Sequence, residues 1–258
     1  MPDLARVGFA EVVAYRSELV IWILTATLPL VMLAMWDAVV ADGPVQGFDR
    51  DAIARYFVAT LIVRQLGASW LVWEVNDDIR TGALSGQLLR PVDPLLVKAV
   101  PMVMALPLRL LVLAPILSLV ILARPGLVVW PGVAAFALFA WTMVVAWCMN
   151  LAVQACFCAL SFWIDKSDGL FGLWLAVWSL LSGYVAPMAM FPEATQHALR
   201  WLPFRGMLAL PVEILTGFLS PRDAVADIAI QALWVVVLAT LGRFSWRAGL
   251  RRYGAFGA

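Results

Sequence analysis

A run of charged residues between two long apolar segments is the first feature of this sequence that could do chemistry. Residues 73–94, WEVNDDIRTGALSGQLLRPVDP, include Glu74, Asp77, Asp78 and Arg80. Only 14% of the chain is charged, whereas 64% is hydrophobic. So dense a group of charges must lie in water or against a soluble partner, because the interior of a bilayer excludes it. The sequence predicts a docking surface here, and a solvated loop is the alternative.

The sequence contains none of the common motifs for binding a metal, for binding a nucleotide or for a catalytic nucleophile. There is one histidine, His197, and the three cysteines, Cys148, Cys156 and Cys158, lie in one apolar run. Neither His-Glu-x-x-His nor Cys-x-x-Cys occurs, so we expect buried thiols and no metal site. The chain also lacks a G-x-x-x-x-G-K-[ST] phosphate loop and a G-x-S-x-G nucleophile elbow.

The elements that position the charged run are apolar segments long enough to cross a membrane. A mean hydropathy of +0.91 and repeated uncharged runs indicate an all-α polytopic membrane protein. We expect six transmembrane helices, over residues 19–40, 54–73, 104–123, 133–160, 170–188 and 225–244. The first span has no cleavage site after it and is expected to be retained. Residues 1–18 predict an interfacial helix, with a frayed polar terminus as the alternative.

Several polar side chains fall inside the predicted spans. Arg64 is ~15 Å from the charged run at the helical rise, near the bilayer centre, so it requires a partner. We expect it to face the bundle interior and to pair with Asp37, helix carbonyls or a water-filled path, as a structural group or as a substrate contact. Asn150 and Gln154 share one helix face and predict either hydrogen bonds between helices or substrate contact. Arg109 is expected to snorkel to the headgroups.

Residues 189–224 are half apolar but interrupted by prolines, which excludes a single span. We expect short re-entrant helices at the outer surface, with an exposed loop as the alternative. Burial of Glu213 alone would be costly, so we expect it to pair with Arg205 or Arg200. Ten basic residues fall in the segments on the side of the termini and six on the other side, which favours cytoplasmic termini.

The layout resembles a known family, the membrane subunits of bacterial type-two ABC exporters, over nearly the whole chain. The resemblance rests on YRSELVIWI before the first span, on the I-R-x-G-x-L core at Ile79, Arg80, Gly82 and Leu84, and on LLRPVDP after it. It rests as well on the external MFPE and on LPFRGMLALPVEILTG before the last span.

The resemblance implies an architecture and a set of partners. Two permeases, identical or related, would assemble with two ATP-binding subunits in the bacterial inner membrane. ATP and magnesium would be bound by those subunits, with no cofactor in this chain. Membrane lipids are the other expected partners, and nucleic acid is not expected. Residues 74–94 would be the cytoplasmic coupling region and residues 190–217 an external re-entrant cap.

The resemblance also assigns roles within the coupling region. We expect residues 79–89 to form one amphipathic helix that presents Leu84, Leu88 and Leu89 to the ATPase. The charged residues Glu74, Asp77, Asp78 and Arg80 would fix its angle through ion pairs. Ile79 belongs to the same contact region.

Two other classes of function remain open. A secondary transporter would usually need paired ionisable residues at mid-membrane and often internal inverted repeats, but Arg64 is the one deep charge and no repeat is evident. An intramembrane lipid-modifying enzyme could use His197, Arg205 and Glu213 at the outer surface. An ion pair that holds the cap together is the simpler interpretation of those residues.

Overall fold

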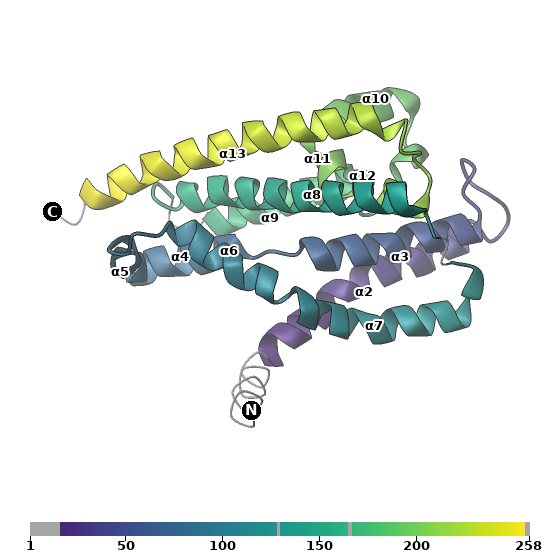
Figure 1. The fold of residues 1–258 in the computed structure, drawn as a ribbon, viewed down its shortest axis with the longest axis horizontal. Helices are drawn as coiled ribbons and strands as arrows, with labels where there is room; N and C mark the ends of the chain where they lie inside the picture. Colours follow the sequence, from purple (N-terminus) through teal and green to yellow (C-terminus); the bar gives the residue numbers. More distant parts are fainter. Residues whose placement is uncertain (1–15, 128–129, 165–166, 256–258) are drawn as a thin grey trace.

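The computed structural model describes residues 16–127, 130–164 and 167–255, and in this part of the chain all regular structure is helical. Most helices run along the long axis of the molecule, as Figure 1 shows. One end carries α4, α5 and the C-terminal end of α13, and the other carries the loop after α2 together with α10 and α12. The interfacial helix predicted for residues 1–18 lies almost wholly outside the described residues.

Between residues 16 and 127, the structure describes six α-helices. They are α2 (Arg16–Val39), α3 (Arg50–Gly67), α4 (Leu71–Thr81), α5 (Ala83–Leu88), α6 (Pro94–Met104) and α7 (Leu106–Ala123). Two of them begin at aspartates that cap the first turn. Asp49 accepts a hydrogen bond from the backbone of Ala52, and Asp93 accepts one from Leu95. Pro94 follows Asp93 at the first helical position, where its missing N–H costs nothing.

The second half begins with α8 (Val133–Leu160) and α9 (Ser167–Leu181). Three short helices follow, namely α10 (Glu193–Trp201), α11 (Pro203–Met207) and α12 (Ala209–Thr216). The last helix is α13 (Ala224–Ala255). The turns η1 (Pro125–Leu127) and η2 (Met188–Met190) lie between these elements.

Among the described residues, four helical segments are long and apolar enough to cross a membrane: Arg50–Thr81, Pro94–Ala123, Val133–Leu160 and Ala224–Tyr253. Thr27–Val39 and Ser167–Leu181 are apolar but shorter. By length and composition, each of the four longer segments could cross a bilayer.

Three predicted segment boundaries differ from the helices. The segment 54–73 is not one helix, because α3 ends at Gly67 and α4 starts at Leu71. The helix expected over 170–188 ends at Leu181, where the chain turns into the loop before η2. The last helix does not stop at residue 244 but continues to Ala255, because its final turns pack an aromatic group that includes Trp246 and Tyr253 against Phe162.

The core is built around α8, which contacts α3, α4, α9, α11, α12 and α13. Its most extensive packing is with α13. At Gly242 the two backbones lie so close that an added Cβ would be 2.8 Å from the carbonyl oxygen of Ala152. Glycine is needed there because the backbone of the facing helix cannot move aside as a side chain could.

Replacing Gly242 with alanine is expected to lower the free energy of unfolding by about 1–3 kcal/mol, because the methyl group overpacks the contact between α8 and α13. Gly172 on α9 is the matched control, since nothing lies within 4 Å of its added Cβ. Gly172→Ala should raise stability by up to about 1 kcal/mol through helix propensity alone. Thermal unfolding in detergent measures both, and a shift of the same sign for the two variants would contradict the packing argument.

Candidate functional site

The charged region forms a helical elbow at one end of the bundle. The helix α4 ends at Gly82, whose positive φ of 76° reverses the chain direction, and α5 begins at Ala83. Glycine adopts this left-handed conformation without strain, so it ends the helix. The prediction of one amphipathic helix over residues 79–89 is therefore wrong, because the region contains the end of one helix and a second short one.

The leucines of the elbow divide into one anchor and two exposed residues. Leu84 is only 1% exposed and packs in a hydrophobic cluster with Leu71 and Val75. Leu88 is exposed, and Leu89 directly after α5 is 88% exposed. The expectation that Leu84 faces a partner is wrong, since this side chain holds α5 against the bundle. A partner at this end would meet Leu88 and Leu89.

One lysine connects α4 to α6. The Nζ of Lys98 lies 2.8 Å from the Oδ2 of Asp78 and 3.7 Å from the Oε2 of Glu74. Gln87 of α5 also donates to Asp78, at 2.9 Å. By contrast, Arg80 pairs with Asp77 at 3.8 Å on the surface, where an ion pair contributes little. Asp78 is thus the charge that fixes the elbow, and its partner Lys98 was not identified from the sequence.

A buried polar group beside the elbow was also missed. Asn76 donates to the hydroxyl of Ser167 at 2.8 Å and to Asp168, and its own oxygen accepts from Ser161. This network joins α4 to the end of α8 at Ser161 and to the first turn of α9 at Ser167 and Asp168. The signal in the sequence was the single uncharged polar residue in WEVNDDIR, which follows Val75 directly and lies one helical turn after Val72, both of which are buried.

The break between α3 and α4 leaves backbone groups without hydrogen-bond partners in their own helix. Side chains of neighbouring helices provide those partners. Arg109 of α7 donates from Nη1 to the carbonyl oxygen of Ala68 at 2.7 Å and lies over the ring of Trp70 at 4.7 Å. Gln154 of α8 accepts from the backbone of Val72 and donates to Ser69. Broken helices are tolerated in a membrane when their freed groups are satisfied in this way.

The contacts at the break test the predictions made for Arg109 and for the polar residues of α8. Arg109 is 1% exposed, so the expectation that it snorkels to the headgroups is wrong. Its guanidinium is held inside the bundle by the break. The hydrogen bonds of Gln154 confirm that this residue links helices. The side chain of Asn150 instead donates to the carbonyl oxygen of Ala146 in its own helix.

Replacing Arg109 with methionine is expected to lower the free energy of unfolding by about 1–3 kcal/mol, because the buried carbonyl of Ala68 loses its donor. Arg124 is the matched control, since it is half exposed and its ion pair lies at the surface. Arg124→Met should change stability by less than about 1 kcal/mol. Thermal unfolding in detergent distinguishes the two arginines, and equal shifts would contradict a special role for Arg109.

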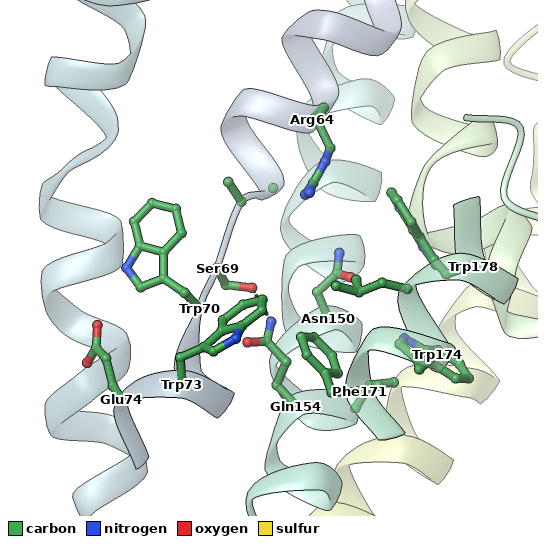
Figure 2. A pocket seen from close by; sticks show the side chains of 14 residues that line it. Arg64, Ser69, Trp70, Trp73, Glu74, Asn150, Gln154, Phe171, Trp174 and Trp178 are labelled. Atoms are coloured by element: carbon green, nitrogen blue, oxygen red, sulfur yellow. Dashed lines mark hydrogen bonds between the residues drawn. The ribbon is translucent and has the colours of Figure 1, made fainter. Parts of the chain in front are cut away.

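A cavity of about 500 Å³ lies beside the break, walled by α3, α4, α8 and α9. Its lining is mostly apolar and includes four tryptophans, at positions 70, 73, 174 and 178. Figure 2 shows Arg64 at one end of this space, with its guanidinium directed toward Asn150, and Glu74 at the other end. This cavity has the size and the mostly apolar lining of small-molecule sites.

Arg64 is stabilised in the cavity wall by aromatic rings. Its guanidinium carbon lies 5.4 Å from the ring centroid of Trp178 and 5.8 Å from that of Tyr184. Of the alternative partners predicted for Arg64, Asp37 is wrong, because Asp37 instead forms ion pairs with Arg124 at 3.1 Å and Arg50 at 3.9 Å. Those contacts lie at the opposite end of α3 from Arg64 and hold the loops after α2 and α7 together.

At the end of the bundle opposite the elbow, three short helices, α10 to α12, cover the bundle and are locked by a cluster of charges. Arg205 lies 2.5 Å from Glu213, which confirms the predicted pair, and 2.6 Å from Asp227 at the start of α13. Asp227 also accepts from Arg200 at 2.6 Å. Burial alone would lower the pKa of Arg205, but Glu213 and Asp227 raise it above its usual value. Asp227 was not identified from the sequence.

The prolines of this segment do not all act as predicted. Pro192 and Pro203 start α10 and α11, but Pro211 lies in the first turn of α12, where no N–H is required. The break before α12 is instead at Leu208, with φ −146° and ψ −61°. Both α11 and α12 pack on α8, and α12 also contacts α3.

The residues considered for an enzyme meet in a second cavity, of about 710 Å³, at the same end of the bundle as α10 to α12. His197, Arg205 and Glu213 all contribute to its lining. Two of the three are engaged in the ion pairs just described, so they hold the outer helices rather than present a free acid and base. Among the described residues, no group of three histidine, cysteine or acidic side chains could hold a metal ion.

Comparison with known proteins adds one finding about the whole chain. A family model described as "ABC-2 family transporter protein" matches residues 23–257. No curated protein and no solved structure matches the chain. The family match includes the elbow, the cavity and the outer helices.

Proposed function

Because the chain belongs to the ABC-2 transporter family, we propose that it is the permease subunit of an ATP-driven exporter. Six helices cross the bacterial inner membrane in this proposal, with both termini in the cytoplasm. Two copies of a separate ATP-binding subunit bind ATP and magnesium and drive the export step. A second permease, identical or related, completes the pathway.

The observation that carries this proposal is the elbow, which the proposal places on the cytoplasmic side. The short helix α5 lies at a turn in the chain and packs on the bundle through the buried Leu84. Leu88 at its end and Leu89 directly after it are exposed. Exposed leucines in an otherwise polar loop favour a soluble partner, because burying them against protein is worth roughly 1.5–3 kcal/mol each. The ATP-binding subunit is that partner in the proposal.

Helix α13 connects the elbow to the outer helices, so a movement of the ATPase could be transmitted along it to the export pathway. Helix α13 contacts both ends of the bundle: Asp227 near its start bonds Arg200 and Arg205, and Tyr253 near its end lies 2.8 Å from Ser85 of α5. A rigid helix held at both ends would carry a displacement of α5 to the outer cap. The cap would then open the exit when the ATPase closes.

The proposal is tested by purifying the tagged chain in mild detergent and identifying the ATP-binding protein that copurifies with it. Leu89→Glu is expected to reduce recovery of that protein at least tenfold, because a charge replaces the exposed contact. Trp201→Glu is the matched control, since Trp201 is also a large exposed residue but lies at the outer end. Recovery of the ATPase with Leu89→Glu at the level of the parent would overturn the docking role.

A further inference from the structure

The cavity beside the helix break has no role in docking the ATPase or in holding the outer helices. We propose that it is a binding site for an amphipathic anion, with the acidic group at Arg64 and the apolar part between the tryptophans. The site lies within one protomer and is formed by α3, α4, α8 and α9.

The charge of the cavity favours an anion at its deep end. Arg64 forms no ion pair with a carboxylate in the part of the chain that the structure describes. Its buried Nε has no hydrogen-bond partner, its contact with Trp178 uses the face of the guanidinium, and Tyr184 adds a side-chain hydrogen bond to its ring contact. The edge of an arginine remains suited to a carboxylate or phosphate, which it binds through paired donors.

Glu74, the acidic residue in the cavity lining, does not pair with Arg64. Glu74 lies at the far end of the space in Figure 2, and its carboxylate is 3.7 Å from the Nζ of Lys98. Its charge is therefore balanced by a lysine outside the cavity lining. An acidic ligand at Arg64 would meet a local excess of positive charge.

The walls favour an apolar body on the same ligand. Trp73, Trp174 and Trp178 supply flat apolar surface along the space, and Phe171 lies between them. Trp73 is 47% exposed and marks the open side of the cavity. A ligand that enters past Trp73 could place its apolar chain among the indole rings while its acidic group reaches Arg64. The chain is then removed from water, and the acidic group is paired with a positive charge.

The ligand chemistry is tested on the purified permease alone with dibrominated stearate, whose bromines quench indole fluorescence on contact. The parent should show saturable quenching of part of its emission, because four of its thirteen tryptophans line the cavity. The methyl ester of the same molecule should bind at least about tenfold more weakly, which corresponds to the loss of one charge-assisted contact. Equal binding of the acid and its ester would overturn the proposal.

Substitutions identify the residue that holds the acidic group. Arg64→Gln should raise the half-saturating concentration about tenfold or more, whereas Arg64→Lys, which keeps the charge but loses the paired donors, should raise it by a smaller factor. Arg55→Gln is the matched control, because Arg55 lies on the same helix over Phe218 and not in this cavity. If Arg64→Gln binds the stearate like the parent, or if Arg55→Gln weakens binding as much, the assignment is wrong.

Two sources could supply such a ligand: an acidic lipid of the inner leaflet or the exported molecule itself. In vesicles with the partner ATPase, ATP should release an exported anion and abolish the quenching, whereas a resident lipid should stay bound. Both results support an anion site at Arg64. Only this last step rests on the proposed function, so failure of the binding test would overturn the site and leave the docking proposal standing.

Discussion

Replacing Asp227 with asparagine is expected to lower the free energy of unfolding by about 3–5 kcal/mol, because it leaves the buried guanidinium of Arg205 with one of its two carboxylates. Asp227 is 6% exposed and contacts both Arg200 and Arg205 at 2.6 Å. The substitution keeps the size of the side chain, so the effect isolates the charge. Thermal unfolding in detergent should show the loss as a lower midpoint.

Asp223 provides the control for this experiment. It lies four positions earlier, is exposed, and bonds only to Ser220 among the partners that the structure describes. Asp223→Asn should change stability by no more than about 0.5 kcal/mol. A loss of similar size for both variants, or none for Asp227→Asn, would show that the charge cluster does not hold the outer helices to α13.

The same cluster predicts how the outer segment responds to chemical labelling. Single cysteines at the buried positions Leu208 and Val212 should be protected from a membrane-impermeant thiol reagent, whereas cysteines at the exposed positions Leu202 and Phe218 should react. Asp227→Asn should increase labelling at Leu208, since α11 would be released from α13. Uniform labelling of all four positions in the parent would identify an exposed loop and contradict the packed arrangement.

Reversing the charge of Lys98 is expected to have the second large effect, on the coupling of ATP hydrolysis to export. Lys98→Glu places a third carboxylate beside Asp78 and Glu74, so α4 and α6 should separate and α5 should lose its fixed angle. The ATPase activity of the reconstituted complex should then no longer respond to the permease. Adding Asp78→Lys restores one opposite-charge pair and should recover a coupling energy of about 1–3 kcal/mol in a double-mutant cycle.

Arg80 separates this bridge from surface charge in general. It pairs with Asp77 at 3.8 Å, and both side chains are more than half exposed. Arg80→Glu should therefore change stability by less than about 1 kcal/mol and leave coupling close to that of the parent. If Arg80→Glu and Lys98→Glu uncouple export equally, the orientation of the elbow does not depend on the Asp78 bridge.

Composition and spacing were enough to determine the class of this protein and the order of its parts. Long uncharged runs can satisfy their backbone groups in lipid only as helices, so the all-α character followed directly from the sequence. The helix α8 begins and ends at the predicted residues 133 and 160, because no proline or charge interrupts that run. The pair of Arg205 and Glu213 was predictable as well, since two isolated charges near one another in an apolar segment require each other.

Only the tertiary structure decided which polar groups meet across helices and where the helices break. Gly67 and Ser69 permit a break within residues 54–73 but do not require one, since the break depends on Arg109 and Gln154 of other helices to satisfy the freed backbone. Asp37 and Asp227 found partners 87 and 27 residues away in the chain. Apolar segments can pack in many orders with similar burial, so spacing along one helix cannot specify its neighbours. The cavity at Arg64 exists because four helices meet beside that break.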